Sequence, residues 1–288
     1  MFVVFADARR PLSHRLTRWQ LKKEEAIVKL SCVTASYVGD LLGYPGVIDW
    51  GLASETITRA PMLETIEGIL DRLSPARLDG IEFWYPHVWP ENITPVLASE
   101  IRRRLDARGL VCCACAGSMG DPGEDTYGCE ALFQTTRLLE APLIAAHLKA
   151  HTIPGLGELG ARYGIRVAYE NGSDVDAAQI LAAIQGGNEW IGVNIDTGNM
   201  AAQGGDPVQA VRELGDRIVH VHFKDVPAVG SHECVAIGQG IVDVPGVIRE
   251  LQACGYDGWL SIEVETGGYD PTEDILSSAE TIRRLWNG

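Results

Sequence analysis

Hydrophobic and polar positions alternate with a period of two along residues 218–226, IVHVHFKDV. In a β-strand this period places His220, His222 and Lys224 on one face and Val219 and Val221 on the other. Two imidazoles and an amine on one face are not typical of an ordinary core strand. The stretch therefore predicts a strand that presents polar side chains to a pocket at the end of a buried sheet.

The rest of the chain alternates between strand-like and helix-like segments. Short apolar runs predict strands, and apolar residues spaced three or four apart predict helices, several of which end at a glycine. The predicted strands span residues 26–34, 80–86, 110–117, 142–148, 165–171, 190–199, 218–226 and 256–266. The predicted helices span residues 60–74, 93–109, 127–141, 156–164, 176–185, 206–215, 244–255 and 271–288.

This alternation predicts an α/β fold with a parallel sheet, and a closed (β/α)8 TIM barrel uses every repeat. The length of 288 residues suits one such barrel. The alternative is an open doubly wound sheet, which usually has fewer strands and a glycine-rich phosphate loop after the first strand. No G-x-G-x-x-G follows residues 26–34, and no G-x-x-x-x-G-K-[ST] occurs in the chain. The barrel is therefore the favoured fold.

Residues 1–25 differ from the repeats that follow. They contain six of the 24 basic residues and little apolar periodicity. We expect an N-terminal extension, either an arm that packs on a partner subunit or a solvated segment. The catalytic barrel domain is then expected to span residues 26–288.

Composition narrows the classes of function. The net charge is −15 and the pI is about 4.8, and such a surface repels nucleic-acid phosphates. The chain has no apolar run of ~18 residues, the length that a membrane span requires. The seven cysteines are an odd number without framework spacing. We therefore expect a cytoplasmic protein that binds neither nucleic acid nor membranes.

In a (β/α)8 barrel, chemistry takes place where the strands end. Polar residues stand at the ends of most predicted strands: Glu82, His147, Glu170, Asn171, Asp196, Asn199, His220, His222, Lys224, Glu263 and Glu265. The last four strands thus supply Glu, Asp, His and Glu, and three carboxylates would repel one another without a cation. The pattern predicts a divalent metal. Ligands without sulfur suit Mg²⁺, Co²⁺, Fe²⁺ or Zn²⁺, and the many oxygens favour Mn²⁺ most.

Four stretches carry a family resemblance. They are YEN at 169–171, DTGN at 196–199, HVHFKD at 220–225 and the run 238–265, and in this order they resemble the xylose isomerase-like TIM barrels. That superfamily includes sugar phosphate isomerases and epimerases, ketose 3-epimerases, inosose dehydratases, hydroxypyruvate isomerases and endonuclease IV. The resemblance is strong over 165–288, whereas residues 26–150 match only in strand and helix rhythm.

The resemblance implies one metal bound by Glu170, Asp196, His222 and Glu263. His222 is preferred to His220 because the family's ligand precedes x-x-Asp, a position that Asp225 fills. Glu263 is preferred to Glu265 because it ends the L-S-I-E match.

One function within the superfamily is disfavoured. Many relatives have a histidine where Asn199 stands, and in the endonucleases that histidine helps to hold further metals. The endonucleases also need Asp-x-His on the loop after the seventh strand, where this chain has VPAVGSHE. Together with the acidic charge, these departures argue against an AP endonuclease.

The resemblance implies proton abstraction next to a carbonyl, through a metal-stabilised enediolate, with Glu170 or Glu263 as the base. The leading hypothesis is an isomerase or epimerase of a keto sugar or polyol. The alternative is a lyase or dehydratase acting on a 3-keto sugar, keto-glycoside or inosose, with His147 or Lys224 as the acid. A non-catalytic sugar-binding subunit is a third hypothesis, against which the intact glutamates argue.

The remaining predictions concern the substrate and the partners. Four residues are predicted to bind substrate: Glu82, His147, Asn199 and Lys224. The alternative to substrate binding is a salt bridge for Glu82 and a structural role for His147. Four aromatic residues are expected either to form one wall of a sugar-binding pocket or to pack within ordinary loops: Tyr37, Tyr44, Trp84 and Trp89. We expect a small unphosphorylated carbohydrate or polyol as substrate and a homo-oligomer, with a hetero-subunit partner as the alternative.

Overall fold

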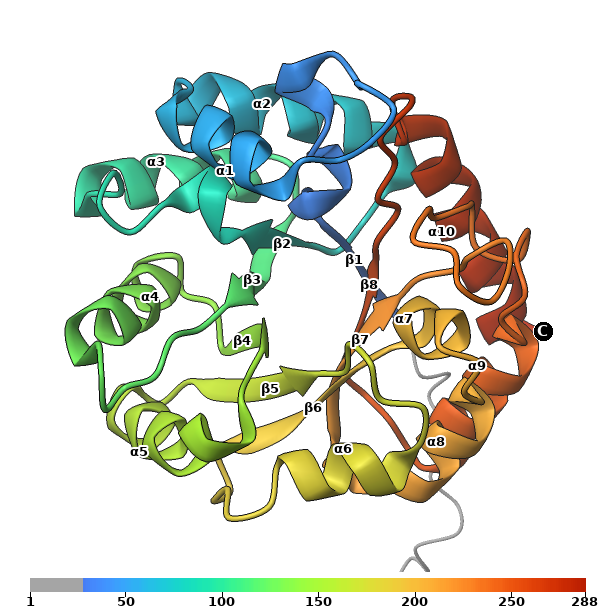
Figure 1. Cartoon of the computed structure of the whole chain (residues 1–288). Coiled ribbons are helices and arrows are strands. Elements are labelled where there is room, and N and C mark those ends of the chain that lie inside the picture. The colour runs from blue at the N-terminus through green and yellow to red at the C-terminus, as the bar shows by residue number, and fades with distance from the viewer. Residues whose placement is uncertain (1–27) are drawn as a thin grey trace, which may run out of the picture.

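The eight strands form a closed barrel in which every strand is parallel to its neighbours and strand order follows sequence order. This computed structural model describes residues 28–288, so the extension predicted for residues 1–25 lies outside the described residues. Figure 1 shows helices surrounding the ring of strands, which confirms the predicted (β/α)8 barrel. The strands are β1 (Lys29–Val33), β2 (Gly80–Trp84), β3 (Val111–Ser118), β4 (Leu143–His147), β5 (Arg166–Glu170), β6 (Ile191–Asp196), β7 (Ile218–Phe223) and β8 (Trp259–Ile262).

The register of the last strands brings their carboxyl ends to one level. Asp196 pairs with His222 across β6 and β7, and His222 pairs with Ser261 across β7 and β8. Glu170 pairs with Asn194, two residues before Asp196. Because all strands are parallel, the side chains that follow these pairs meet at the same mouth of the barrel.

Three of the predicted strands extend well past their observed ends: the seventh ends at Phe223, before the predicted residue 226, and the sixth and the eighth also end early. The sixth ends at Asp196 because the side chain of Asp196 accepts a hydrogen bond from the backbone N–H of Asn199, at 2.8 Å, and so caps the helix that begins at Thr197. The eighth ends at Ile262, and Glu263 and Glu265 lie in the segment that follows it. The apolar pattern continues past the ends of the sixth and the eighth strands, so it does not reveal them.

The helices that form the outer layer match the predicted ones, with two additions. They are α1 (Trp50–Arg59), α2 (Met62–Leu73), α3 (Pro95–Asp106), α4 (Thr126–Leu138), α5 (Ile153–Tyr163), α6 (Ala177–Ala183), α7 (Thr197–Ala202), α8 (Pro207–Leu214), α9 (Val244–Ala253) and α10 (Thr272–Asn287). Helix α1 is absent from the prediction because only Ala53 and Ile57 of its residues are buried. Helix α7 follows directly from the cap at Asp196.

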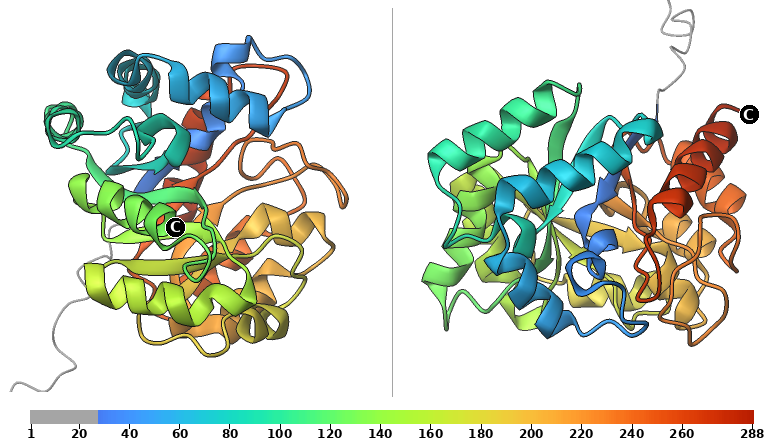
Figure 2. Two further views of the ribbon diagram at one scale, coloured as in Figure 1. Left: turned by 60° about the vertical axis from the view of Figure 1, so that its left-hand side comes forward. Right: turned by 90° about the horizontal axis from the view of Figure 1, so that it is seen from above.

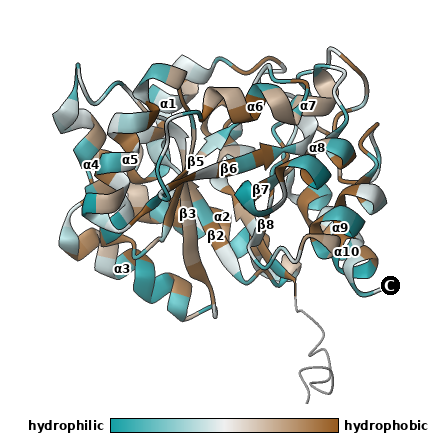
Figure 3. Cartoon of the chain, turned by 90° about the horizontal axis from the view of Figure 1, so that it is seen from below, coloured by the Kyte–Doolittle hydropathy of each residue, from teal (hydrophilic) through white to brown (hydrophobic). Residues whose placement is uncertain are grey.

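Buried apolar residues form a small cluster of Val33, Ala35 and Ala116 beside Trp84, and two larger clusters. The largest lies between helices and strands and includes Phe83, Phe133 and Phe223, all with no exposed surface. The other consists only of strand residues, among them Cys113, Ala145 and Ala168, which places it within the ring of strands. In Figure 3 the helices around the barrel show both hydrophilic and hydrophobic colours, as expected for elements with one face on a core.

The two further views in Figure 2 show the same single layer of helices outside the strands. Six of the seven cysteines are buried, and all seven are free thiols. Among the residues that the structure describes, no helix is both long enough and apolar enough to cross a membrane.

Candidate metal centre

Four side chains converge at the carboxyl ends of the last four strands. Glu170 and Asp196 are the final residues of β5 and β6, His222 lies in β7, and Glu263 directly follows β8. One ligand atom from each residue lies within 4.8 Å of those of the other three, and all four residues are buried. The structure therefore brings together the metal ligands that the sequence predicts.

Three atoms at this centre are buried without a hydrogen-bond partner: Asp196 Oδ2, His222 Nδ1 and Glu263 Oε2. The imidazole Nδ1 lies 3.2 Å from Glu263 Oε2 and 3.5 Å from Glu170 Oε1. Leaving buried polar atoms unpaired is costly, and gathering carboxylates adds repulsion. A divalent cation relieves both costs, so the donor set fits a metal that prefers oxygen and nitrogen ligands.

The other oxygen of Asp196 is already engaged in positioning the strand ends. Asp196 Oδ1 accepts the N–H of Asn199. Asn171 bonds both backbone groups of Asp196, since its Oδ1 accepts the N–H at 2.8 Å and its Nδ2 donates to the carbonyl at 3.0 Å. Asn199 Nδ2 in turn donates to the carbonyl of Asn171. These bonds direct Asp196 Oδ2 toward the centre.

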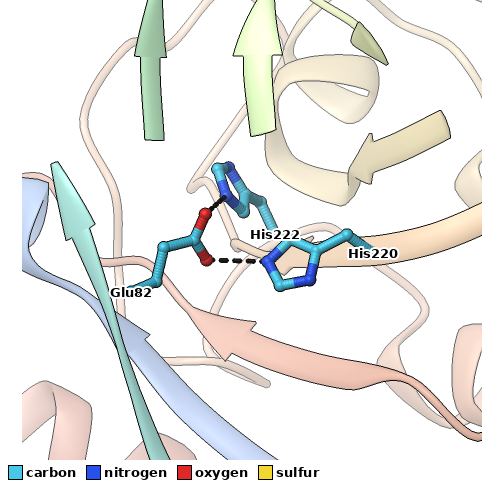
Figure 4. Close-up of side chains that lie close together, drawn as sticks. All are labelled: Glu82, His220 and His222. Carbon is cyan, nitrogen blue, oxygen red and sulfur yellow. Dashed lines mark hydrogen bonds and ion pairs between the residues drawn. The ribbon is translucent and has the colours of Figure 1, made fainter. Parts of the chain in front are cut away.

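His222 is held by groups on two other strands. Its backbone N–H donates to Asn194 Oδ1 at 3.0 Å. Its Nε2 lies 3.0 Å from Glu82 Oε1, and the second oxygen of Glu82 lies 2.7 Å from His220 Nε2. Figure 4 shows Glu82 of β2 reaching between the two imidazoles. Because Nε2 faces this carboxylate, Nδ1 is the nitrogen that remains for a metal.

Glu82 is buried below the cavity and does not face the space in which a substrate would bind. It has no exposed surface, and it is not among the residues that line the cavity above the centre. Burial disfavours its ionised form, but the charges and hydrogen bonds of His220 and His222 lower the pKa of Glu82 below its usual value. Its role in substrate binding remains a prediction that the geometry does not favour, because both oxygens are bonded to histidines.

Lys224 provides the only ammonium group among the residues that line the cavity. Its Nζ lies 2.9 Å from Glu265 Oε2 and 3.1 Å from both Asp196 Oδ2 and Glu263 Oε2. Burial disfavours the charged amine, but these carboxylates raise the pKa of Lys224 well above its usual value. Gly198 makes room for the side chain, because a Cβ there would lie 2.6 Å from Lys224 Cγ.

The carboxylates differ in their readiness to hold a proton. Burial opposes ionisation in each, but His222 lowers the pKa of Glu170, and Lys224 and His222 lower the pKa of Glu263. Burial raises the pKa of Asp196. Burial also raises the pKa of Glu265 to about 8, against the opposing charge of Lys224. The mouth thus contains ionised carboxylates beside a group that can remain protonated near neutral pH.

A cavity of about 940 Å³ opens above the centre. Its metal side is lined by His147, Glu170, Asn199, Lys224, Glu263 and Glu265. The side chain of His147 is 52% exposed, with Nε2 3.5 Å from Glu170 Oε1. Three of the four residues predicted to bind substrate thus face this space.

The other side of the cavity is aromatic: Trp50, Trp84, Tyr85, Trp89 and Tyr127. Trp84 and Trp89 belong to the aromatic wall that the sequence predicts. Tyr37 does not, because it is fully buried and its hydroxyl bonds Thr272. Apolar periodicity does not single out Trp50, because it does not predict helix α1, which begins with this residue.

Comparisons with known proteins agree with this geometry. A family model described as xylose isomerase-like TIM barrel matches residues 70–285. An inosose dehydratase of Lactiplantibacillus plantarum is 33% identical over 129 residues, which cover 38% of this chain and 43% of that protein. A 3-dehydroshikimate dehydratase of Pseudomonas putida is 29% identical over 143 residues, covering 45% of this chain and 22% of that protein. The matches thus span less than half the length of either dehydratase.

A solved structure of L-ribulose 3-epimerase superposes with a TM-score of 0.69 and 19% sequence identity. The superposition covers 91% of this chain and 95% of that one. At this identity the likeness concerns the fold.

Proposed function

This chain belongs to the xylose isomerase-like TIM barrel family, and from that premise we propose that it is a metal-dependent enzyme that removes the proton next to the carbonyl of a keto sugar or keto polyol. The observation that carries the proposal is the convergence of buried ligand atoms of Glu170, Asp196, His222 and Glu263, three of which lack a hydrogen-bond partner, beneath an open cavity. Relatives named inosose dehydratase and 3-dehydroshikimate dehydratase support it.

Glu170, Asp196, His222 and Glu263 are the residues that would hold the metal, for which Mn²⁺ is our first candidate. A divalent ion at this centre supplies positive charge that stabilises the negative charge developing on the substrate's carbonyl oxygen. The base is then Glu170 or Glu263, because both line the cavity and both are ionised carboxylates.

We infer elimination as the first outcome, which makes the protein a lyase or dehydratase. The carboxylate takes the α-proton, and the electron pair of the C–H bond forms a double bond to the carbonyl carbon while the carbonyl π pair moves to oxygen. When that pair returns to re-form the carbonyl, a double bond forms between the α- and β-carbons, the C–O bond at the β-carbon breaks, and its oxygen leaves with a proton as water or an alcohol. His147 and Lys224 both face the cavity and are the candidate donors of that proton. The dehydratase names of the relatives favour this outcome.

Epimerisation or isomerisation is the second outcome, and a specific feature favours it. Glu170 ends β5 and Glu263 directly follows β8, and both line the same cavity, so one can remove a proton while the other returns one to the opposite face or to the adjacent carbon. Elimination needs only one such base. Both outcomes share the first step.

The test is proton exchange in D₂O. Protein loaded with Mn²⁺ is incubated with scyllo-inosose, 3-keto-glucosides and free ketoses, and ¹H NMR follows loss of the signal next to the carbonyl. We expect exchange with at least one of these compounds, with an unsaturated product for elimination and an epimer for the alternative. Glu263→Gln is expected to slow the exchange by at least ~100-fold. Full exchange in that variant, or none in any loaded sample, would contradict the proposal.

A further inference from the structure

The cavity is much larger than the ring that the metal centre would hold. Cavities of ~300–1,000 Å³ enclose drug-sized ligands, and this one, at about 940 Å³, is near the upper end. A single sugar or cyclitol ring beside Glu170 and Glu263 leaves most of it unfilled. The volume of the cavity therefore indicates that the substrate carries a further chemical group.

The unfilled part has a definite position in the fold. The metal ligands come from β5 to β8, whereas the aromatic residues come from β2, α1, α4 and the segment after β2. Figure 1 shows α1 and α4 on the side of β1 to β4, across the barrel from α7 and α8. The aromatic side is therefore a neighbouring subsite and not part of the metal centre.

Two tryptophans form the fixed part of this subsite. Their rings lie 5.5 Å apart, centroid to centroid, in an edge-to-face arrangement, and Trp50 keeps 42% of its surface exposed. The backbone N–H of Trp84 donates to Thr34 Oγ1 at 2.8 Å, which fixes the end of β2. Large aromatic surface left in water is unfavourable, and stacking a flat ring upon it recovers that cost.

The charges of the lining limit what this ring can carry. Glu91 and Asp125 are the charged residues of the aromatic side. The basic residues of the lining, Lys224 and His147, belong to the metal side, and Lys224 is already paired with carboxylates. A phosphate or carboxylate substituent would therefore meet repulsion at the aromatic side.

We propose that the substrate is a keto sugar that carries a second, uncharged ring with an apolar face, held by Trp50 and Trp84 while the carbonyl of the keto sugar faces the metal centre. This proposal rests on the proposed function for the orientation of the sugar. The second ring is an aromatic aglycone or another sugar, because both present an apolar face that packs on tryptophan.

The test is isothermal titration of the Mn²⁺-loaded protein with glucosides that lack a keto group and are not turned over. Phenyl β-D-glucopyranoside and cellobiose are compared with methyl β-D-glucopyranoside. We expect at least one of the first two to bind ~10-fold or more tightly than the methyl compound, and which of them does so identifies the kind of ring. Carboxyphenyl β-D-glucopyranoside is expected to bind more weakly than its phenyl counterpart.

Variants then locate the preference. Trp50→Ala and Trp84→Ala are expected to abolish it, and Trp50→Phe to retain part of it. Leu52→Ala is the matched control, because Leu52 is exposed on the same helix and does not line the cavity. Equal or undetectable binding of all three glucosides overturns the proposal, as does a preference that survives both alanine variants.

Failure of this proposal is distinguishable from failure of the proposed function. Proton exchange on keto substrates without a ring preference removes only the second subsite. A ring preference that depends on Trp50, without exchange on any keto compound, leaves the subsite and removes the proposed reaction.

Discussion

His222 has two ring nitrogens with different neighbours, and this division fixes which of them can bind a metal. Nε2 lies against Glu82, whose other oxygen lies against His220, while Nδ1 faces Glu170 and Glu263. A carboxylate behind a ligand imidazole fixes the ring's orientation and increases its basicity. Glu82 is thus a positioning residue that acts through His222.

The Glu82→Gln variant tests this role. We expect Mn²⁺ affinity to fall by ~10–100-fold, as is usual when the partner of a ligand histidine is lost. Isothermal titration measures the affinity, and ¹⁵N NMR of the histidine rings reports whether His222 keeps the proton on Nε2. Glu91→Gln, which changes an acidic residue at the cavity rim, is the control. Unchanged affinity and an unchanged tautomer in Glu82→Gln would rule out the positioning role.

The convergence of the four candidate ligands could be predicted from the sequence because each stands at or near the end of a strand, where the fold exposes it to the mouth. Their role as metal ligands stays a prediction. The choice of His222 over His220 required the family resemblance, since alternation places both on one face. The contacts of Glu82 with the two histidines could not be predicted from the sequence, because the histidines are 138 and 140 residues away along the chain.

His87 introduces a pH dependence of stability that is independent of the metal centre. It is 3% exposed, its Nδ1 has no hydrogen-bond partner, and burial lowers its pKa from 6.5 to about 4. Between these values the unfolded chain binds a proton that the folded one does not, so stability is lost as the pH falls from about 6.5 to about 4. The loss attributable to His87 is at most ~3 kcal/mol.

Urea unfolding at several pH values measures this term. The His87→Phe variant is expected to show a smaller loss of unfolding free energy between pH 6.5 and 4 than the unchanged protein does. His232→Gln, at an exposed histidine, serves as the comparison. Parallel pH profiles for His87→Phe and the unchanged protein would show that His87 makes no such contribution.

At the scale of elements, the segment after β7 is held by one carboxylate. Asp225 has no exposed surface, and its two oxygens accept the backbone N–H groups of Val226 and Val242 and of Gly238 and Gly240. These bonds fold the long connection to α9 back onto the end of β7. They also fix the backbone beside Lys224.

Asp225→Ala is expected to lower the free energy of unfolding by about 3 kcal/mol or more, because it removes a charged acceptor from several N–H groups. Urea denaturation followed by circular dichroism measures the change. Asp216→Ala, at an exposed aspartate, is expected to stay within about 0.5 kcal/mol of the parent. A similarly small effect at Asp225 would show that solvent replaces the carboxylate without cost.

Most helices and strands could be predicted from the apolar periodicity. The helices that the prediction missed are those whose start depends on a single polar capping side chain. Asp49 caps α1 by accepting the N–H of Leu52, and Asp196 caps α7. Neither helix has a continuous apolar stripe in sequence. Periodicity detects elements that bury a face over several turns, whereas these helices begin because of their caps.

At the scale of the whole molecule, a metal held by residues of the last four strands would link the second half of the barrel to overall stability. A ligand that binds only the folded state stabilises it by ~2.7 kcal/mol at a concentration of 100 times Kd. We therefore expect Mn²⁺ at that excess to raise the free energy of unfolding by about this amount. Thermal unfolding with Mn²⁺ and with EDTA measures the difference.

The control for this experiment is Asp196→Asn, which keeps the size of the side chain but weakens the ligand set. Its stability is expected to respond much less to Mn²⁺. A parent protein whose unfolding is the same in Mn²⁺ and EDTA would contradict the metal site. The volume of the cavity could not be predicted from the sequence, because it depends on how the loops are placed in space. The homo-oligomer remains a prediction.

The contact between Glu82 and His222 has a consequence for building chimeric barrels. The aromatic side belongs to the first half of the barrel and the ligands to the second, which invites exchange of the first half to change substrate preference. Yet β2 of the first half supplies the carboxylate behind a ligand of the second. A first half taken from another barrel must therefore have an acidic residue at the position of Glu82. Without it, His222 would lose the carboxylate that orients its ring.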